Sequence, residues 1–278
     1  MREKLELEVS RDGVLNELSL KGDLDLRISN PAYASVFVTL PRAASLGGLI
    51  GDKNDLQFKT HPNVDKKAWA DKGEIRLKEG KKGFPVNQAL GVLKWRLSGK
   101  DDKFVPVSIT CWPSVDMASQ SATISLEYEL TRPDLALHSF AIALPIPPGA
   151  LASVDEEPSV GQCSYDDSRS AFIWTVDVVS EQEGTQTGSL EIAVRGLDDD
   201  VVSSALAARG GGEDADDDDD DDERENKVFF PVNVAFVLDH SVCGLEVLAV
   251  SAADGSSLAD GEDYSVDVLS STDRYAVV

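Results

Sequence analysis

The chain has few cysteines and histidines, the residues typical of disulfides, redox sites and zinc sites. It has 278 residues, of which three are cysteines, three are histidines and two are methionines. Cys111, Cys163 and Cys243 are odd in number and widely spaced, without a CxxC pair, which predicts reduced, buried thiols instead of a disulfide framework or a zinc site. No early run of about 18 apolar residues occurs, and residues 2–4 are charged. We therefore expect neither a membrane span nor a secretory signal of the chain's own.

Positive charge is also scarce, with 26 Lys or Arg against 50 Asp or Glu and a formal net charge of −24. This balance argues against a nucleic-acid partner, because phosphate binding needs a basic surface. The charge is uneven: residues 213–225 hold eleven acids and one base, and we expect residues 210–227 to form an acidic, disordered linker. Between Lys53 and Lys103, thirteen basic residues stand against seven acidic ones, which predicts a locally basic face that attracts an acidic partner.

Motifs for catalysis and cofactor binding are missing. His61, His138 and His240 form no HExxH motif, and the His240/Cys243 pair has no second pair nearby in sequence, so zinc is not expected. No GxSxG nucleophile elbow occurs. The glycine-rich residues 47–51 lack the GK[ST] ending of a phosphate-binding loop and indicate a flexible hairpin loop. The sequence predicts a protein that is not an enzyme and that uses no cofactor or metal.

Short segments of alternating apolar and polar residues, the period of a half-buried strand, are abundant. In the first of them Leu5, Leu7 and Val9 alternate with charged residues. No long helical stripe is sustained, since the best helix candidate, residues 201–209, is short and runs into three glycines. We therefore predict an all-β fold, with strands at residues 5–9, 18–20, 24–28, 36–40, 56–58, 75–77, 92–97, 105–109, 122–128, 139–144, 171–176, 189–194, 228–237, 245–250, 264–269 and 275–278.

The four tryptophans divide by their sequence context. Trp95 and Trp174 lie inside apolar strands and are predicted to belong to the core. Trp69 and Trp112 are flanked by loop signals and are predicted to be exposed. An exposed indole pair would offer a platform for recognition of a partner.

Several motifs are long and unusual enough in composition to carry a resemblance. Together they resemble the C-terminal mu-homology domain of the coatomer delta subunit, which is related to the medium chains of clathrin adaptors, and they cover nearly the whole chain. The acidic run is an insertion relative to that family, and the longin-like N-terminal domain of the delta subunit is absent. The motifs are THPNVDKK (60–67), FPVN (84–87), GVLKWRL (91–97), CWPS (111–114), YEL (128–130), LPIP (144–147), DSR (167–169), Trp174, GSLE (188–191), FFPVNVAF (229–236) and the terminal Tyr275.

This resemblance implies an elongated β-sandwich structure of two subdomains, with the second inserted in the first. The composition shifts near residues 98–103 and at the acidic run agree with such a division. The expected organisation is a first part of subdomain A at residues 1–97, an inserted subdomain B at 98–209, the acidic linker at 210–227, and the completion of subdomain A at 228–278.

In functional terms, the resemblance implies a module of the COPI coat that works in Golgi-to-endoplasmic-reticulum transport. Its implied ligands are short, acidic, tryptophan-containing peptides of an endoplasmic reticulum tethering complex and of an Arf GTPase-activating protein. Other coatomer subunits are implied partners, and the implied location is cytoplasmic, peripheral on Golgi membranes and COPI vesicles, with membrane contact only through the coat. Clathrin-adaptor medium chains bind tyrosine-based signals with a Trp-x-Arg in a late strand, where this chain has Val266-Asp-Val268. Binding of tyrosine signals is therefore not expected.

The peptide site is expected in subdomain B, where an indole would enter an apolar pocket while Lys or Arg neutralise the flanking acids of the peptide. Residues 155–158, Asp-Glu-Glu-Pro, depart from the apolar character of the family at this place. They would form an acidic rim that repels an acidic ligand. The residues predicted to form the wall of the pocket are Val160, Cys163 and Tyr165, together with the facing loop from Thr185 to Gly188.

Two other classes of function remain open from the sequence. An acidic chaperone of basic proteins, such as histones, also combines a β core with a poly-Asp tract, but such tracts are usually tails, and here strand-like segments follow the acids. A carbohydrate-active enzyme on a β-sandwich would need two positioned carboxylates, which an abundance of acids does not supply.

Overall fold

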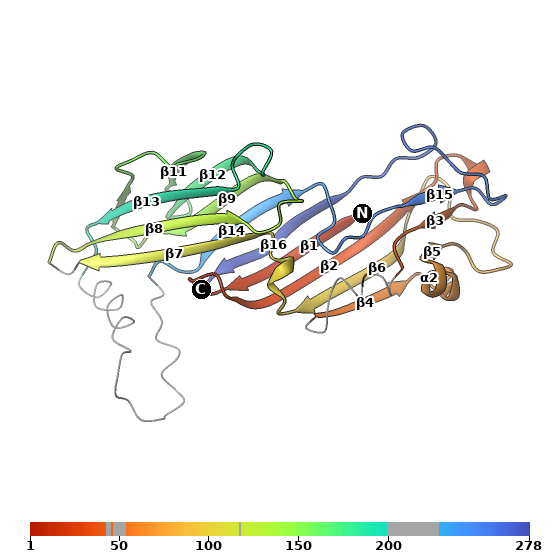
Figure 1. Cartoon of the computed structure of the whole chain (residues 1–278), viewed down its shortest axis with the longest axis horizontal. Helices are drawn as coiled ribbons and strands as arrows, with labels where there is room; N and C mark the ends of the chain where they lie inside the picture. Colours follow the sequence, from red (N-terminus) through yellow and green to blue (C-terminus); the bar gives the residue numbers. More distant parts are fainter. Residues whose placement is uncertain (43–45, 47–53, 117, 199–227) are drawn as a thin grey trace, which may run out of the picture. The chain divides into compact units, whose positions relative to one another are not determined.

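The computed structural model describes residues 1–42, 46, 54–116, 118–198 and 228–278 (Figure 1). Most of these residues lie in strands, which confirms the predicted all-β fold class. The helix predicted at 201–209, the acidic linker at 210–227 and the glycine-rich loop at 47–51 lie outside the described residues. Within the described part of the chain, no helix has both the length and the apolar character needed to cross a membrane.

The elements follow one another as short antiparallel strands with few helical turns between them. Their bounds are β1 (Arg2–Val9), β2 (Leu15–Arg27), η1 (Pro31–Tyr33), β3 (Phe37–Thr39), β4 (Asn54–Thr60), α2 (Lys66–Lys72), β5 (Glu74–Ile75), β6 (Ala89–Gly99), η2 (Asp102–Phe104), β7 (Val107–Asp116), β8 (Ser121–Leu130), β9 (Leu137–Pro145), β10 (Leu151–Ser153), β11 (Gln162–Asp166), β12 (Ala171–Val179), β13 (Thr187–Arg195), β14 (Val232–Leu238), β15 (Ala249–Ser251) and β16 (Leu269–Val277).

Four strand predictions need correction. The strand predicted at 228–237 begins only at Val232. The segments at 18–20 and 24–28 belong to one long strand, β2, because both pair with β6. Of the segment at 245–250, only the last two residues lie in a strand, β15. The strand predicted at 264–269 is wrong except for its last residue, since Tyr264 forms only an isolated bridge with Asp260. Alternation predicts which side chains point inward, but a strand also needs a neighbour with which to pair.

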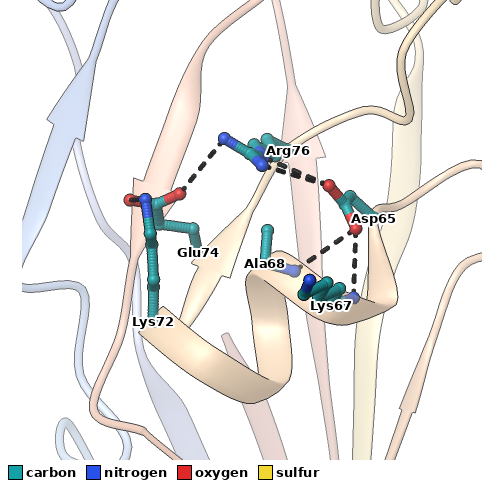
Figure 2. Close-up of polar contacts among 6 residues, drawn as sticks. All are labelled: Asp65, Lys67, Ala68, Lys72, Glu74 and Arg76. Atoms are coloured by element: carbon teal, nitrogen blue, oxygen red, sulfur yellow. Dashed lines mark hydrogen bonds and ion pairs between the residues drawn. The ribbon is translucent and has the colours of Figure 1, made fainter.

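The helix α2 was not predicted, although both of its ends carry capping residues. At its start, the Asp65 carboxylate accepts hydrogen bonds from the backbone N–H groups of Lys67 and Ala68, at 3.0 and 3.3 Å (Figure 2). The hydrogen bond from Ala68, followed by those from the Arg76 guanidinium and from Lys67, lowers the pKa of Asp65. At its end, Gly73 adopts φ +72°, and a Cβ atom there would lie 2.2 Å from the Leu40 carbonyl oxygen. Both are standard ways to satisfy helix ends.

This helix explains why the predicted exposure of Trp69 is wrong. One face of α2 packs inward, so the Trp69 side chain is only 5% exposed. Its ring meets the Phe58 ring of β4 edge-to-face, with centroids 5.2 Å apart. Loop signals around Trp69 are therefore caps of a short helix that buries its indole.

The chain divides into two compact units. Unit 1 is Met1–Glu6, Glu17–Phe104 and Leu238–Asp273, and unit 2 is Leu7–Asn16, Val105–Val237 and Arg274–Val278. The unit boundaries fall inside β1, β2, β14 and β16, whereas the predicted scheme kept residues 7–16, 228–237 and 274–278 in subdomain A and residues 98–104 in subdomain B. The subdomain organisation stays a prediction, and the two units are described separately.

In unit 1, hydrogen bonds join the strands in the order β16-β1-β2-β6-β4, and a smaller sheet has the order β15-β3-β5. Gly22 of β2 lies opposite Trp95 of β6. A Cβ atom at position 22 would stand 2.1 Å from the indole ring, so only glycine leaves room for this buried tryptophan. The predicted core position of Trp95 is confirmed.

The most unusual core group of unit 1 is Glu3, which is 2% exposed and lies on the same side of β1 as Leu5. Its Oε1 accepts hydrogen bonds from Trp95 Nε1 at 2.9 Å, from the Ser241 hydroxyl at 2.8 Å and from the Cys243 thiol at 3.0 Å. Its Oε2 accepts from the Val242 backbone N–H at 2.7 Å and shares the single proton of the Ser270 hydroxyl, at 3.0 Å, with the His240 carbonyl, which lies 2.7 Å from that hydroxyl.

These five donors come from positions up to 267 residues away in sequence. A buried carboxylate is costly unless hydrogen bonds replace its lost hydration. The donors to Glu3 on β1 come from β6, from the turn at 241–243 and from the start of β16, so the network joins segments that are far apart in sequence in the core of unit 1.

We predict that Glu3→Gln destabilises the protein by about 2–3 kcal/mol, because buried donors lose their acceptor. The amide can place an oxygen on only one side, so either Trp95 Nε1 or the Val242 N–H then faces an NH₂ group. Urea unfolding followed by tryptophan fluorescence measures the loss. The matched control is Glu6→Gln, whose half-exposed pair with Lys21 is worth less than about 1 kcal/mol. Equal, small losses in both variants would contradict the role of Glu3.

In unit 2, one sheet runs β11-β12-β9-β14 and continues to the end of β16, and a second sheet runs β10-β13-β8-β7. Side chains from the two sheets meet in the core: the Tyr128 ring of β8 lies 5.0 Å from Phe140 of β9 and 5.2 Å from Trp174 of β12, between centroids. The Tyr275 hydroxyl near the end of the chain donates to the Val107 carbonyl at 2.7 Å. Two facing sheets form a β-sandwich.

Candidate functional site

A groove of ≈ 550 Å³ lies on the outer face of β7, β8 and β13, which run side by side in unit 2 (Figure 1). The strand register sets its floor in two rows, Ser108–Glu129–Thr187 and Thr110–Glu127–Ser189. Residues of two loops, Ser159 and Val160 on one and Gly184 on the other, complete the lining. The complete lining is Ser108, Thr110, Glu127, Tyr128, Glu129, Ser159, Val160, Gly184, Thr187, Gly188 and Ser189.

Tyr128 and Gly188 form a matched pair under the groove. They lie opposite each other in the β8/β13 ladder, and a Cβ atom at position 188 would stand 2.3 Å from the Tyr128 ring. The ring therefore lies across the glycine, and its hydroxyl donates to the Thr185 carbonyl at 2.9 Å. Burial raises the pKa of Tyr128 to about 12, so the hydroxyl stays a donor at neutral pH.

The wall of the groove is held by hydrogen bonds on both sides. Trp174 Nε1 donates to the Val160 carbonyl at 2.8 Å. The Ser159 backbone N–H donates to the Ser189 carbonyl at 3.0 Å, and the Ser189 N–H donates to the Ser159 hydroxyl at 2.8 Å. These bonds tie the loop to β13. The groove is therefore formed before any ligand arrives, which lowers the entropic cost of binding.

The groove is polar at its floor and negatively charged. Glu127 and Glu129 are exposed, and none of the residues that line the groove is Lys or Arg. Val160 contributes the aliphatic part of the wall. The arrangement offers an apolar corner beside carboxylates, a setting for a peptide side chain and not for an acidic group.

The structure brings together part of the predicted pocket. Val160 and Gly188 both line the groove. Thr185 stands at its edge, with its hydroxyl donating to the Val178 carbonyl at 2.8 Å and its own carbonyl bonded to Tyr128. Cys163 and Tyr165 lie on β11, opposite Trp174 and Phe172 of β12, and do not line the groove. The role of all five in binding stays a prediction.

Ser108, Thr110, Glu127 and Glu129 were missed. They occupy outward positions of strands that alternation had located, so their exposure was accessible from sequence. The order of the strands could not be predicted from sequence, because alternation holds no information on the pairing of β8 with both β7 and β13.

The remaining tryptophan predictions for unit 2 are confirmed. Trp174 is buried, and Trp112 is 50% exposed on β7. Trp112 faces outward two residues beyond Thr110, and its partner in the ladder is Ser125.

The described residues outside the groove show no arrangement of side chains typical of a metal site or of a reactive thiol. No group of three or more His, Cys, Asp or Glu side chains gathers there in a way that would hold a metal ion. All three cysteines are free thiols, with Cys111 and Cys243 buried as predicted and Cys163 half-buried. Burial raises the pKa of Cys111 to about 12, raises that of Cys243 well above its usual value, and, with the charge of Glu157, raises that of Cys163.

A thiol with a raised pKa holds little thiolate at pH 8, and the thiolate is the reactive form. We predict that Ellman's reagent labels Cys163 slowly and leaves Cys111 and Cys243 unlabelled in the folded protein. All three thiols should react within minutes in denaturant. Fast labelling of two or more thiols under native conditions would contradict the burial described here.

The packing of Tyr128 predicts that Gly188→Ala destabilises the protein by about 1–3 kcal/mol, the usual cost of overpacking. The added methyl group displaces the ring and with it the Tyr128–Thr185 hydrogen bond. Thermal unfolding measures the effect. Ser189→Ala on the same strand, with its side chain exposed, is the control and should change stability by less than about 0.5 kcal/mol. If Gly188→Ala left the thermal stability unchanged, the Tyr128 ring would have to fit another position in the core.

Known proteins with similar sequences are coatomer delta subunits. The chain is 26% identical over 280 residues to a probable coatomer subunit delta of Caenorhabditis elegans, a match that covers 99% of this chain and 45% of the relative. It is 28% identical over 254 residues to coatomer subunit delta of Arabidopsis thaliana, with 89% and 40% covered. The chain thus spans less than half of the length of these relatives.

Solved structures show the same fold. The yeast delta-COP-I mu-homology domain matches with a TM-score of 0.72 at 23% identity, over 100% of this chain and 95% of that one. The same yeast domain complexed with a Dsl1 WxWxV peptide matches with a TM-score of 0.70 at 24% identity, over 100% and 96%.

The family model described as the adaptor complexes medium subunit family matches residues 1–272. This match covers nearly the whole chain and agrees with the resemblance carried by the motifs and with the fold of unit 1 and unit 2. The chain belongs to the adaptor complexes medium subunit family, and its relatives are coatomer delta subunits.

Proposed function

We propose that this chain is a non-enzymatic module of the COPI coat that binds short tryptophan-containing peptides. Its membership of the adaptor medium subunit family and the coatomer delta names of its relatives support a coat role. The yeast mu-homology domain with a bound WxWxV peptide supports the ligand class, since that domain shares this fold. The related coatomer delta subunits are more than twice as long as the part that this chain matches. The coat role is therefore proposed for a protein that contains such a domain.

The observation that carries the proposal is the preformed groove of unit 2. Val160 and Gly188 offer an apolar corner above the Tyr128 and Trp174 rings. An indole is large, flat and mostly apolar, and its N–H seeks one acceptor. The hydroxyls of Ser108 and Thr110 and the carboxylates of β8 supply acceptors on the opposite side. In this proposal the Thr185 loop forms the far wall, and Cys163 and Tyr165 contact the outer part of the peptide.

The partners in this proposal are the other coatomer subunits and tryptophan motifs of an endoplasmic reticulum tethering complex and of an Arf GTPase-activating protein. The module would act in the cytoplasm, on Golgi membranes and COPI vesicles, during retrograde transport, and would reach the membrane only through the coat. The net charge of −24 supports the absence of a nucleic-acid partner.

A titration tests the peptide-binding proposal. A Trp-x-Trp peptide with uncharged flanks should bind the full chain with a Kd of roughly micromolar size, the strength of a modest anchor, and replacement of both tryptophans by alanine should abolish binding. Isothermal titration calorimetry measures both. Absence of binding by the tryptophan peptide at low salt would contradict the proposal.

A pair of variants locates the site. Val160→Ser should weaken binding about five- to tenfold, because part of a buried valine side chain is lost. The control is Leu151→Ser, an apolar residue of unit 2 that is 76% exposed and lies outside the groove, which should leave the Kd unchanged. Equal effects of the two variants would place the peptide elsewhere.

A further inference from the structure

We infer that the groove selects its peptide by charge: it takes tryptophan motifs flanked by Lys or Arg and disfavours those flanked by Asp or Glu. This inference rests on the proposed peptide-binding function and reverses the charge that the family resemblance implies for the ligand. It concerns a short, extended segment of another protein, held across β7, β8 and β13.

The first support is the charge of the floor. Glu127 and Glu129 lie two residues apart on β8, so both side chains point out of the same face. Both are exposed, and within the described part of the chain neither appears in an ion pair with Lys or Arg. Their row neighbours Ser108, Thr110 and Thr187 are uncharged. The two carboxylates are therefore available to a cation on a ligand.

The second support is the charge of the two loops that close the groove. Residues 155–157 are Asp-Glu-Glu, all exposed, and lead directly into the wall at Ser159 and Val160. Glu181 and Glu183 are exposed and precede Gly184 on the other loop. An acidic flank would meet like charge from the floor and from both loops, whereas a basic flank would find opposite charge at these same places.

Neither Arg11 nor Arg132, two basic residues in the described part of unit 2, belongs to the lining of the groove. The turn that contains Gly13 lies beside Ser108, and the Arg11 carbonyl accepts from the Cys111 N–H at 3.1 Å. The Arg11 side chain is nevertheless not part of the lining. The Arg132 guanidinium donates two hydrogen bonds to the Asp134 carboxylate, at 2.8 and 2.6 Å, so Asp134 already pairs with its charge.

The third support is an aromatic platform next to the groove. Trp112, half exposed, follows Thr110 on the outer face of β7, and Thr110 lies opposite Glu127. Trp112 is thus the diagonal neighbour of Glu127 across the ladder, within reach of one extended side chain. A carboxylate beside an exposed indole suits a guanidinium or ammonium group, which the ring attracts over its face.

The difference in affinity between the peptides should be modest, because the carboxylates of the groove are exposed to solvent. Each solvent-exposed ion pair changes an affinity by roughly 1.5- to fivefold. With several acids acting together, a peptide with basic flanks should bind about three- to tenfold more tightly than its neutral counterpart at low ionic strength. The difference should shrink as salt is raised through physiological strength, because exposed charges are screened over about 8 Å there.

The experiment uses the full chain and four peptides of equal length. Three share a Trp-x-Trp core and differ only in their flanks, which are Lys, Ser or Glu; the fourth has Lys flanks and an Ala-x-Ala core. Calorimetry at low and at physiological salt gives the affinities. The charge variant is Glu127→Gln with Glu129→Gln, two exposed changes that should not disturb folding. Its control is Glu191→Gln, also exposed and on the same face of β13 but outside the lining.

The expected order of affinity is Lys flanks, then Ser, then Glu, with the advantage of the Lys peptide lost in the double variant and kept in the control. The charge selection is overturned if the Glu-flanked peptide binds best, if the Lys advantage survives in the double variant, or if the Ala-x-Ala peptide binds as tightly as the Lys-flanked tryptophan peptide. In the first two cases the tryptophan-binding function stands. If no tryptophan peptide binds, the proposed function itself fails.

Discussion

The packing of the Tyr128 ring between Gly188 and Trp174 is the constraint on which the groove of unit 2 depends. The missing side chain at position 188 lets the ring lie flat under β13, and the ring then fixes the Thr185 carbonyl. Trp174 fixes the Val160 carbonyl from the other side. Tyr128, Gly188 and Trp174 therefore hold the loop with Val160 and the loop with Thr185 in place. A binding surface held in this way needs little reorganisation when a peptide arrives.

Unit 1 depends on a different device, a buried carboxylate in place of an aromatic ring. Glu3 gathers donors from Trp95, from the turn at Ser241 and from Ser270, so that segments from the beginning, middle and end of the chain share one acceptor. A carboxylate accepts more hydrogen bonds than any neutral side chain, which suits a place where several strands must converge. Gly22 makes room for the indole that donates to it. Both units thus pair a glycine with an aromatic ring across a ladder.

The fold class was predictable because the alternation of Leu5, Leu7 and Val9 and of similar segments records burial directly. The family was predictable from motifs such as CWPS, in which Trp112 is exposed and Cys111 is buried. The burial of Glu3 and Trp69 was not predicted, since the partners that satisfy or cover them lie far away in sequence or depend on a short helix. The groove was found only in part: Val160 and Gly188 came from the resemblance, whereas Glu127 and Glu129 required the strand order. Pairing, and not periodicity, decides which outward residues form one surface.

We propose that unit 2 recognises a tryptophan side chain between the loop at Val160 and the strand at Gly188, on the fold of the adaptor medium subunit family. In this proposal, the acids around this place give the surface a negative charge that favours a ligand with basic flanks. A crystal structure of the chain with a bound Trp-x-Trp peptide tests this claim most directly. The account predicts an indole in contact with Val160 and Gly188 and a peptide backbone across β7, β8 and β13. An indole bound in unit 1, or on the far side of unit 2 at β11, would contradict it.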